Sequence, residues 1–187
     1  MAKLNKTKLA VSKGLYSTFR AVGYDGATLV ALSQATGLGK ASLYYHFPGG
    51  KKEMAVELLR SSVAELNQLA FRHLGKKKKT PSDRLQRFLS GFSDYVSQGE
   101  ENCLAAMFVL GGERSRFQDS IKQQSESWLA ELGSTYSETG LSDKKAHRKA
   151  LEMFTSLHGA LCVARMLDDP GVFQQTVNRL SKSLANL

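Results

Sequence analysis

The sequence has few helix-breaking residues and no long apolar run. Its three prolines, Pro48, Pro81 and Pro170, fall where helical patterns start or stop, and no segment alternates apolar and polar residues as a strand does. It lacks the run of about eighteen apolar residues that a membrane-spanning helix needs, and it lacks the apolar stretch of a secretory signal. We therefore expect an all-α chain with a cytoplasmic location and no membrane partner.

Residues that carry catalytic chemistry are equally sparse. Cys103 and Cys162 are the only cysteines, and in a reducing cytosol we expect both to be thiols. The sequence has no nucleophile-elbow, zinc-protease or paired-carboxylate pattern. The four histidines are too dispersed to predict a metal site: His46, His73, His147 and His158. We expect neither an enzyme nor a cofactor, and we predict no catalytic or metal-binding residues.

What the sequence does have is basic charge near its start. Residues 1–52 hold eight lysines and arginines against one acid, Asp25, whereas residues 80–187 hold 12 basic and 13 acidic residues. The whole chain carries a formal charge of +9. A basic region beside a nearly neutral body is typical of a protein that binds a polyanion. Nucleic acid and an anionic membrane surface are both partners of this kind.

Residues 28–47, reading TLVALSQATGLGKASLYYHF, predict two short helices joined by a glycine turn. Thr28 is a good N-cap for the first helix, and Gly37 ends it. Residues 40–47 form the second, with Leu43 facing inwards. A helix held by apolar residues on one side, with short or polar side chains on the other, is typical of a helix-turn-helix that reads the DNA major groove.

The outward side chains of this region are candidates for DNA contact. Those at the start of the second helix would face base edges, its rings would bond phosphates, and two lysines open the next helix at the positive end of its dipole. An alternative is that the aromatic rings pack the small bundle, although Leu38, Leu43 and Phe47 already occupy the inward positions. The candidates are Lys40, Ala41, Ser42, Tyr44, Tyr45, His46, Lys51 and Lys52.

Residues 6–60 resemble the DNA-binding domain of the TetR family of transcriptional repressors. The resemblance implies a homodimeric repressor that binds a palindromic operator in double-stranded DNA and is released by a small-molecule effector. It also adds Thr28 to the expected DNA contacts. The segments 47–51 and 101–105 resemble the LmrA and YxaF branch of the family. The residues that carry the family resemblance are Phe19, Gly23, Tyr24, Thr28, Leu32, Gly37, Leu38, Lys40, Leu43, Tyr44, Tyr45, His46, Phe47, Lys51, Glu53 and Met54.

The expected architecture is an N-terminal three-helix DNA-binding bundle, joined by a long helix to a C-terminal helical ligand-binding and dimerisation domain. We place the DNA-binding domain at 1–50 and the regulatory domain at 51–187, with a connecting helix at 51–74. Gly23 is expected to end the first helix. Further helices are predicted at about 82–97, 102–110, 114–137, 143–167 and 171–187.

The last two predicted helices each carry an apolar stripe that a dimer could use. A dimeric DNA reader needs a two-fold interface, and two such hairpins would supply a four-helix bundle. The alternative is that each stripe covers its own core, which is the commoner role of an amphipathic helix. The predicted interface residues are Leu157, Leu161, Ala164, Phe173, Val177, Leu180 and Leu184.

A ligand pocket is expected between the long helix and the helices after Pro81, because apolar pockets are lined by adaptable methionines and flat aromatic rings. His158 would be its polar anchor. The alternative is that these side chains are ordinary core and that His158 is a hydrogen-bonded core histidine. The candidate lining residues are Leu66, Phe88, Phe92, Met107, Phe108, Trp128, Met153, Phe154 and His158.

The sequence thus predicts a ligand-responsive transcriptional regulator. Ligand binding near the middle of the long helix would move that helix as a lever and change the spacing of the two reading helices. One rival is an architectural DNA-binding protein that needs no ligand. A second is an enzyme with an incidental basic region, for which the sequence offers no reactive constellation.

Overall fold

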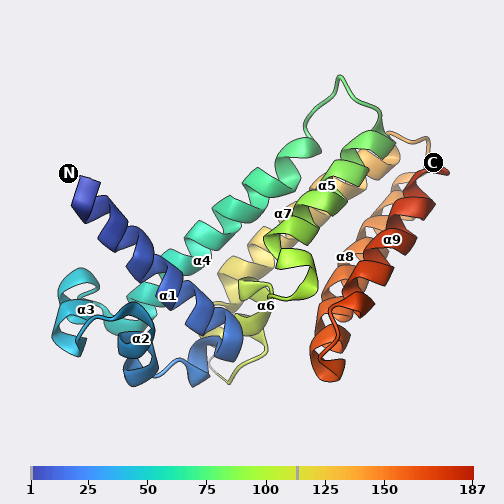
Figure 1. The fold of residues 1–187 in the computed structure, drawn as a ribbon. Coiled ribbons are helices and arrows are strands. Elements are labelled where there is room, and N and C mark those ends of the chain that lie inside the picture. Colours follow the sequence, from blue (N-terminus) through green and yellow to red (C-terminus); the bar gives the residue numbers. More distant parts are fainter. Residues whose placement is uncertain (1, 113) are drawn as a thin grey trace. The chain divides into compact units, whose positions relative to one another are not determined.

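The computed structural model describes residues 2–112 and 114–187, with side chains for residues 11–112 and 115–187. The side chains of Lys3, Lys6 and Lys8, which contribute to the basic N-terminal region, lie outside this range. The described chain is helical and has no strand, as predicted (Figure 1). Its elements are α1 (Ala2–Gly26), α2 (Leu29–Thr36), α3 (Lys40–His46), α4 (Gly50–Leu69), η1 (Phe71–His73), α5 (Pro81–Tyr95), η2 (Ser97–Gly99), α6 (Leu104–Val109), η3 (Arg114–Arg116), α7 (Gln118–Ser137), α8 (Asp143–Leu167) and α9 (Gly171–Leu184).

Two compact units make up the structure, and both are discontinuous in sequence. Unit 1 comprises Met1–Val63 and Leu104–Gln118, and unit 2 comprises Ala64–Cys103 and Asp119–Leu187. The predicted boundary at residue 50 differs from this division, because the first part of α4 and the whole of α6 pack with the N-terminal helices. Helix α4 runs from one unit into the other.

Unit 1 is built around buried side chains of α1 and α6. The ring of Phe108 lies edge-on to Phe19 at 5.6 Å and to Tyr24 at 6.2 Å, measured between ring centroids. Phe117 completes this aromatic cluster, 5.1 Å from Tyr24 and 4.8 Å from Phe108. The carboxylate of Asp25 accepts a hydrogen bond from the Gly112 N–H at 2.6 Å. The α6 segment is therefore part of the body that carries the predicted helix-turn-helix.

Unit 2 packs its helices closely enough to end α4 early. Gly91 of α5 lies directly on the backbone that follows α4, where an added Cβ would be 1.9 Å from the Leu69 carbonyl oxygen. The α-helix gives way to a 3₁₀ turn, η1, directly after this contact. Helix α4 thus ends at Leu69, whereas the sequence predicts a helix to residue 74.

Candidate functional site

The two short helices of unit 1 have the caps and the turn that their sequence predicts. Thr28 is extended, and its hydroxyl oxygen accepts a hydrogen bond from the Ala31 N–H at 3.1 Å. Gly37 ends α2 with φ 68° and ψ 10°, a left-handed conformation that a residue with a Cβ adopts only at a cost. The Ser33 hydroxyl donates to the Leu38 carbonyl across the turn at 2.5 Å. These local bonds fix the direction in which α3 leaves the turn.

One side of α3 is anchored in unit 1 and the other faces solvent. Leu32 and Leu43 are fully buried, and Phe47 is half-buried. The side chains predicted to contact DNA from this helix all lie on the exposed side: Lys40, Ala41, Ser42, Tyr44, Tyr45 and His46. This side of α3 therefore offers short, basic and hydroxyl-bearing groups to a partner, the combination that phosphate and base-edge contacts require.

The aromatic residues of α3 do not fill the bundle. Tyr45 is 83% exposed, and its ring lies edge-on to the His46 ring, 5.4 Å away between centroids. Tyr44 is 46% exposed and lies against Gly50 at the start of α4. Two tyrosines with this much exposed ring contribute little to the core and are typical of a binding surface.

Lys51 does not point away from the protein as the sequence predicts. Its ammonium group donates a hydrogen bond to the Tyr24 carbonyl at 3.0 Å and lies 4.3 Å from the centroid of the Tyr24 ring. Lys51 therefore joins the start of α4 to the end of α1, and a direct phosphate contact is at most part of its role. Lys52, its neighbour, is exposed.

The start of α4 also differs from the expected phosphate site. The Glu53 carboxylate accepts a hydrogen bond from the Gly49 N–H at 2.6 Å, so a backbone donor predicted to receive a phosphate already has an acidic partner. Helix termini favour an acidic side chain at this end for the same dipolar reason that they favour phosphate. Arg20, one of the eight basic residues of segment 1–52, is buried, with its guanidinium 4.5 Å from the Tyr16 ring centroid.

The nine residues predicted to line a pocket do not form one group. Met107 and Phe108 belong to unit 1, where Phe108 packs in the aromatic cluster, so the structure removes both from a pocket in unit 2. The other candidates lie in unit 2, where the ring contacts join Phe71, Phe88, Phe92, His158, Phe154 and Trp128 in a closed circuit, beside buried Leu66 and Met153. Phe71 is the member of this circuit that the sequence analysis missed.

His158 has the bonds of a core histidine. Its Nδ1 donates to the Phe154 carbonyl at 3.0 Å, and its ring lies between those of Phe92 and Phe154. Burial disfavours the charged form, but the contacts with the Cys103 side chain and the Phe154 carbonyl outweigh it and raise the pKa of His158 above its ordinary value. Trp128 has a polar partner too, since its indole N–H donates to Asn67 Oδ1 at 2.9 Å.

The predicted dimer stripes mostly cover the core of their own subunit. Five of the seven residues are buried in the single chain, namely Leu157, Leu161, Ala164, Phe173 and Leu184, while Val177 and Leu180 are half-buried. Helices α8 and α9 lie side by side and bury these stripes against each other and against α5 (Figure 1). The apolar residues left in solvent are on the outer side of α8: Leu151, Val163, Met166 and Leu167.

A surface hollow of about 340 Å³ lies between α7 and α8 in unit 2. None of the predicted pocket residues lines it; its walls are Leu129, Ala130, Gly133, Ser134, Ser137, Asp143 and His147. In the described residues, no three or more His, Cys, Asp or Glu side chains gather as a metal site would require. No helix in the described part of the chain has both the length and the apolar composition needed to cross a bilayer.

Comparisons with known proteins agree with the geometry of unit 1. Residues 13–58 match the family described as "Bacterial regulatory proteins, tetR family". The HTH-type transcriptional regulator LmrA of Bacillus subtilis is 26% identical over 150 residues, which are 78% of this chain and 79% of that protein.

Solved structures share the fold over nearly the whole length. A TetR transcriptional regulator from Legionella pneumophila superposes with a TM-score of 0.79 at 17% identity, covering 94% of this chain and 96% of that one. A TetR transcriptional regulator from Chloroflexus aurantiacus gives 0.76 at 20% identity, covering 99% and 97%. With its exposed α3 and the match over residues 13–58, the chain has a DNA-binding domain of the tetR type, and over nearly its whole length it shares the fold of solved TetR regulators.

Proposed function

We propose that the protein is a homodimeric repressor that binds a palindromic operator through α3 and leaves it when a small molecule binds unit 2. The observation that carries this proposal is the two-sidedness of α3. Leu43 is fully buried, while every predicted contact residue of the helix is exposed. Lys40, Ala41 and Ser42 are assigned to base edges, and the three residues that follow are assigned to phosphates.

The other predicted contacts take different parts. Lys52 is assigned to phosphate, and the exposed Thr28 N-cap is assigned to the backbone of the duplex. Lys51 is a positioning residue, because its ammonium group is bound to Tyr24. We expect its loss to weaken binding to every sequence alike.

The α6 segment supports a route from effector to DNA. It packs on α1 through Phe108 and through the Asp25 bond to Gly112, and the chain on both sides of it belongs to unit 2. A ligand that favours one arrangement of unit 2 would thus pull on unit 1 through these two connections as well as through α4. A coupling of about 1 to 3 kcal/mol would weaken DNA binding roughly 5- to 150-fold.

The proposed effector site is the ring circuit of unit 2. Phe154 and His158 are only half-buried, so their edge is the part that a flat apolar molecule would reach first. Five of the predicted pocket residues belong to this circuit, namely Phe88, Phe92, Trp128, Phe154 and His158, and Leu66 and Met153 are buried in the same unit. Aromatic walls with few polar groups suit an apolar, planar ligand.

The proposed dimer uses the outer side of α8. Met166 is 77% exposed and Leu167 is 64% exposed, and Gly159 lies on the same helix with open space where a Cβ would project. Exposed apolar side chains at helical spacing are typical of a subunit interface, and a small residue lets two helices approach closely. The exposed Cys162 lies within this surface and provides a natural probe.

Selection of duplexes from genomic DNA, followed by footprinting, tests the repressor assignment. We expect a palindromic site whose half-sites are about one helical turn or a multiple of it apart. Tyr45→Ala should lower affinity for that site at least about tenfold without changing stability, because the side chain is almost free of packing. Leu110→Ala, a matched change at another exposed apolar residue of unit 1, should leave binding intact. Recovery of no preferred sequence would contradict the assignment.

Sedimentation and crosslinking test the dimer. A short bis-maleimide should join two wild-type chains through Cys162, while Cys162→Ser should abolish the product. Met166→Glu should give a monomer that binds the operator weakly. Retention of a full dimer by Met166→Glu would place the interface elsewhere.

A thermal-shift screen with planar apolar compounds tests the effector. A hit should raise the melting temperature and lower operator affinity, and Phe154→Ala should reduce both responses. If the protein binds its DNA, but no compound both raises its melting temperature and releases it from the DNA, the ligand-independent architectural role is favoured instead.

A further inference from the structure

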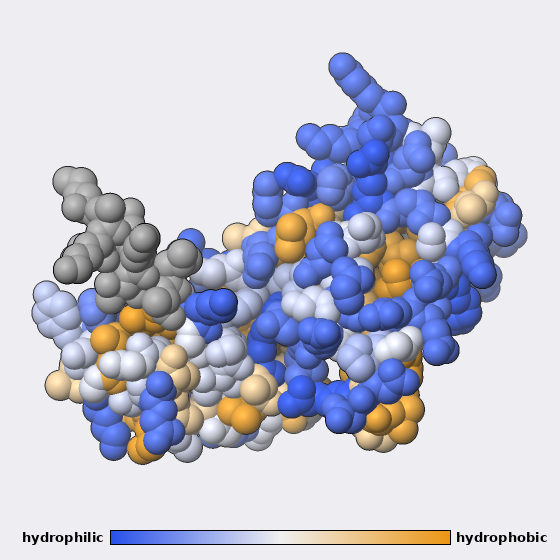
Figure 2. Space-filling model, in the orientation of Figure 1, coloured by the Kyte–Doolittle hydropathy of each residue, from blue (hydrophilic) through white to orange (hydrophobic). Residues whose placement is uncertain are grey.

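A second cationic surface lies in unit 2, apart from the helix-turn-helix in sequence. No acidic residue occurs from Leu66 to Ser82, a stretch that contains four consecutive lysines. Figure 2 shows hydrophilic residues gathered over the loop between α4 and α5. We call the exposed side chains of Arg72, Lys76, Lys77, Lys78, Lys79 and Arg87 the tetralysine surface.

The loop that carries this surface is folded into turns. Lys76 N–H donates to the His73 carbonyl at 3.2 Å, Lys77 N–H to Gly75 at 3.0 Å, and Lys79 N–H to Lys76 at 2.9 Å. The loop then ends at a capped helix, because the Thr80 hydroxyl accepts a hydrogen bond from the Asp83 N–H at 3.1 Å and Pro81 begins α5. The lysine side chains therefore project from a backbone of defined shape.

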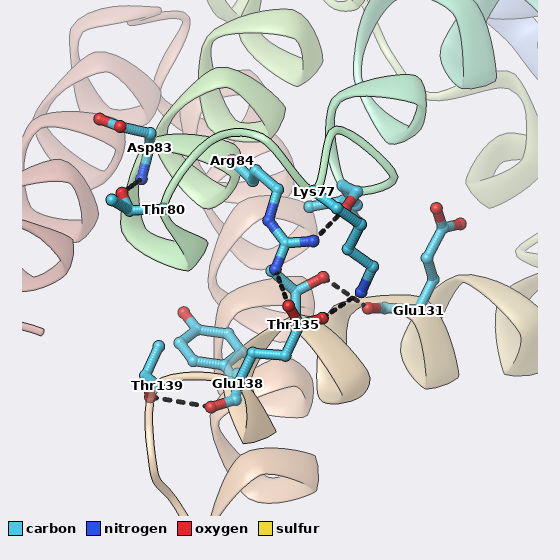
Figure 3. Close-up of polar contacts among 10 residues, drawn as sticks. Lys77, Thr80, Asp83, Arg84, Glu131, Thr135, Glu138 and Thr139 are labelled. Atoms are coloured by element: carbon cyan, nitrogen blue, oxygen red, sulfur yellow. Dashed lines mark hydrogen bonds and ion pairs between the residues drawn. The ribbon is translucent and has the colours of Figure 1, made fainter.

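Arg84 anchors the loop between α4 and α5 to the buried part of unit 2. It is fully buried, and its guanidinium donates to the Leu74 carbonyl at 2.7 Å and to the Glu138 carboxylate at 2.5 Å (Figure 3). The Lys77 ammonium binds the other oxygen of the same carboxylate. Glu138 is thus shared between Lys77 and Arg84, and its charge is already matched by theirs. Lys77 is exposed but paired with Glu138, whereas Lys76, Lys78 and Lys79 are exposed without belonging to this pair.

The basic groups of the tetralysine surface act on a common region. The pKa of His73 lies below its ordinary value, first because of burial and then because of the positive charges of Arg72, Arg87 and Lys76. Charges from η1, from the loop and from α5 therefore converge. Such a convergence produces the positive potential that attracts an extended polyanion.

The composition of the surface selects among polyanions. Phe71 and Leu74, its large apolar residues, are buried, so it offers no exposed ring on which single-stranded bases would stack and no apolar anchor for a bilayer. What remains is exposed lysine and arginine on a loop folded into turns, beside one exposed acid, Asp83, and this excess of positive charge suits the phosphate rows of a duplex. We propose that the tetralysine surface binds the backbone of a second DNA duplex, so that an operator-bound protein bridges two DNA segments. The bridging part rests on the proposed function.

The test uses the full chain with Lys76, Lys78 and Lys79 all changed to glutamine, keeping Lys77 on Glu138. The matched control changes Lys144, Lys145 and Lys182, three exposed lysines of unit 2, to glutamine. Each set is made in the wild type and in a head-deficient variant, K40A/Y45A. Binding to a nonspecific 30-base-pair duplex is measured by fluorescence anisotropy across a salt series.

In the head-deficient background, residual binding should be lost with the loop lysines and kept in the control. The slope of log affinity against log salt should fall by about 2 to 3, since each phosphate contact contributes about 0.9. Three such contacts together correspond to a roughly 40-fold weakening between about 50 and 200 mM salt. An unchanged slope, or an equal loss in the control, would overturn the proposal.

Bridging and membrane binding are measured separately. Bead-bound operator should capture a second labelled duplex with the wild type and the control, but not with the loop variant or the head-deficient variant. Preferential binding to phosphatidylserine vesicles over duplex, lost with the loop lysines, would replace DNA by a membrane partner. The salt series uses the head-deficient background, so it tests DNA binding by the loop lysines independently of α3. Its result therefore holds even if α3 proves not to bind an operator.

Discussion

The two units use the same three arrangements for different purposes. Each has a glycine pressed against a neighbouring backbone, a lysine bound back onto the protein, and a threonine that caps a helix. In unit 1 these are Gly14, Lys51 and Thr28, and all three orient the helices around α3. In unit 2 they are Gly91, Lys77 and Thr80, which surround the junction between α4 and α5. The same change should therefore alter DNA binding in one unit and mainly stability in the other.

The glycine contacts should show the largest effects. An added Cβ would lie 1.9 Å from the Leu69 oxygen at Gly91 and 2.3 Å from the Ala35 oxygen at Gly14, and both obstacles are backbone atoms that cannot rotate away. We expect Gly91→Ala and Gly14→Ala each to lower the free energy of unfolding by about 3 kcal/mol or more. Denaturant unfolding measures this, with Gly75→Ala as the control, because its nearest atom is 4.0 Å away.

The comparison sharpens if the two glycine variants differ in function. Gly14→Ala displaces α2 against α1 and should abolish operator binding even where the protein stays folded. Gly91→Ala, compared at equal folded fraction, should retain binding. Equal loss of binding in both would mean that the units do not separate these roles.

Glu138 should give the next largest effect. Its removal leaves the fully buried Arg84 guanidinium without a counter-charge, and the Nε of Arg84 has no hydrogen-bond partner already. We expect Glu138→Ala to destabilise the protein by about 2 to 4 kcal/mol. Glu126→Ala, which breaks an exposed pair with Lys122 at 3.9 Å, should cost less than about 0.5 kcal/mol. Comparable losses would contradict the role of Arg84.

Lys51 should combine a smaller stability change with a functional one. Lys51→Met removes the bond to the Tyr24 carbonyl and the contact with its ring, and should cost about 1 to 2 kcal/mol. Calorimetry and DNA titration should both detect it. Lys52→Met, at an exposed neighbour, should weaken DNA binding with stability unchanged, and a reversed pattern would return Lys51 to direct phosphate contact.

The two threonine caps form the closest matched pair. Thr28→Ala and Thr80→Ala each remove one side-chain acceptor at 3.1 Å from a backbone N–H, and each should cost about 1 kcal/mol of stability. Only Thr28→Ala should also lower operator affinity. Serine at either position should restore most of the loss, because it keeps the hydroxyl.

Acid should produce the smallest change. The hydrogen bond from Lys77, helped by Arg84, holds the pKa of Glu138 below its ordinary value near 4.5. The associated stability is present above that ordinary value and is lost as the pH falls through the lower folded value. Unfolding measured between about pH 6 and pH 3 should therefore show a steeper decline for the wild type than for Glu138→Gln. Parallel curves would exclude Glu138 as the titrating group.

The helix-turn-helix could be predicted because its determinants are local. A threonine cap, a glycine in the left-handed region and a buried leucine on the next helix each act within a few residues, and all three are found where the sequence places them. The direction of Lys51 could not be predicted, because its partner lies 27 residues earlier in the chain. Local pattern indicates that a lysine starts a helix, but not what it meets there.

The dimer and pocket residues are harder to predict from the sequence for a related reason. Helix α8 is apolar on two sides, and periodicity alone cannot say which side its own subunit covers. Met107 and Phe108 were grouped with a pocket because they follow Pro81 in sequence, whereas the chain returns to unit 1 between residues 104 and 118. The burial of Arg84 carries no signal in the sequence, since Arg72 and Arg87, the arginines on either side of it in the chain, are exposed.

The return of residues 104–118 to unit 1 limits how this protein can be dissected. An excised fragment ending at residue 63 would keep Phe19 and Tyr24 but lose the rings of Phe108 and Phe117 that cover them. Such a fragment would expose the apolar rings of Phe19 and Tyr24 to solvent. A chimera that joins this DNA-binding unit to another ligand-binding domain must therefore keep both 1–63 and 104–118. The new domain would be inserted between residues 63 and 104 and again after 118.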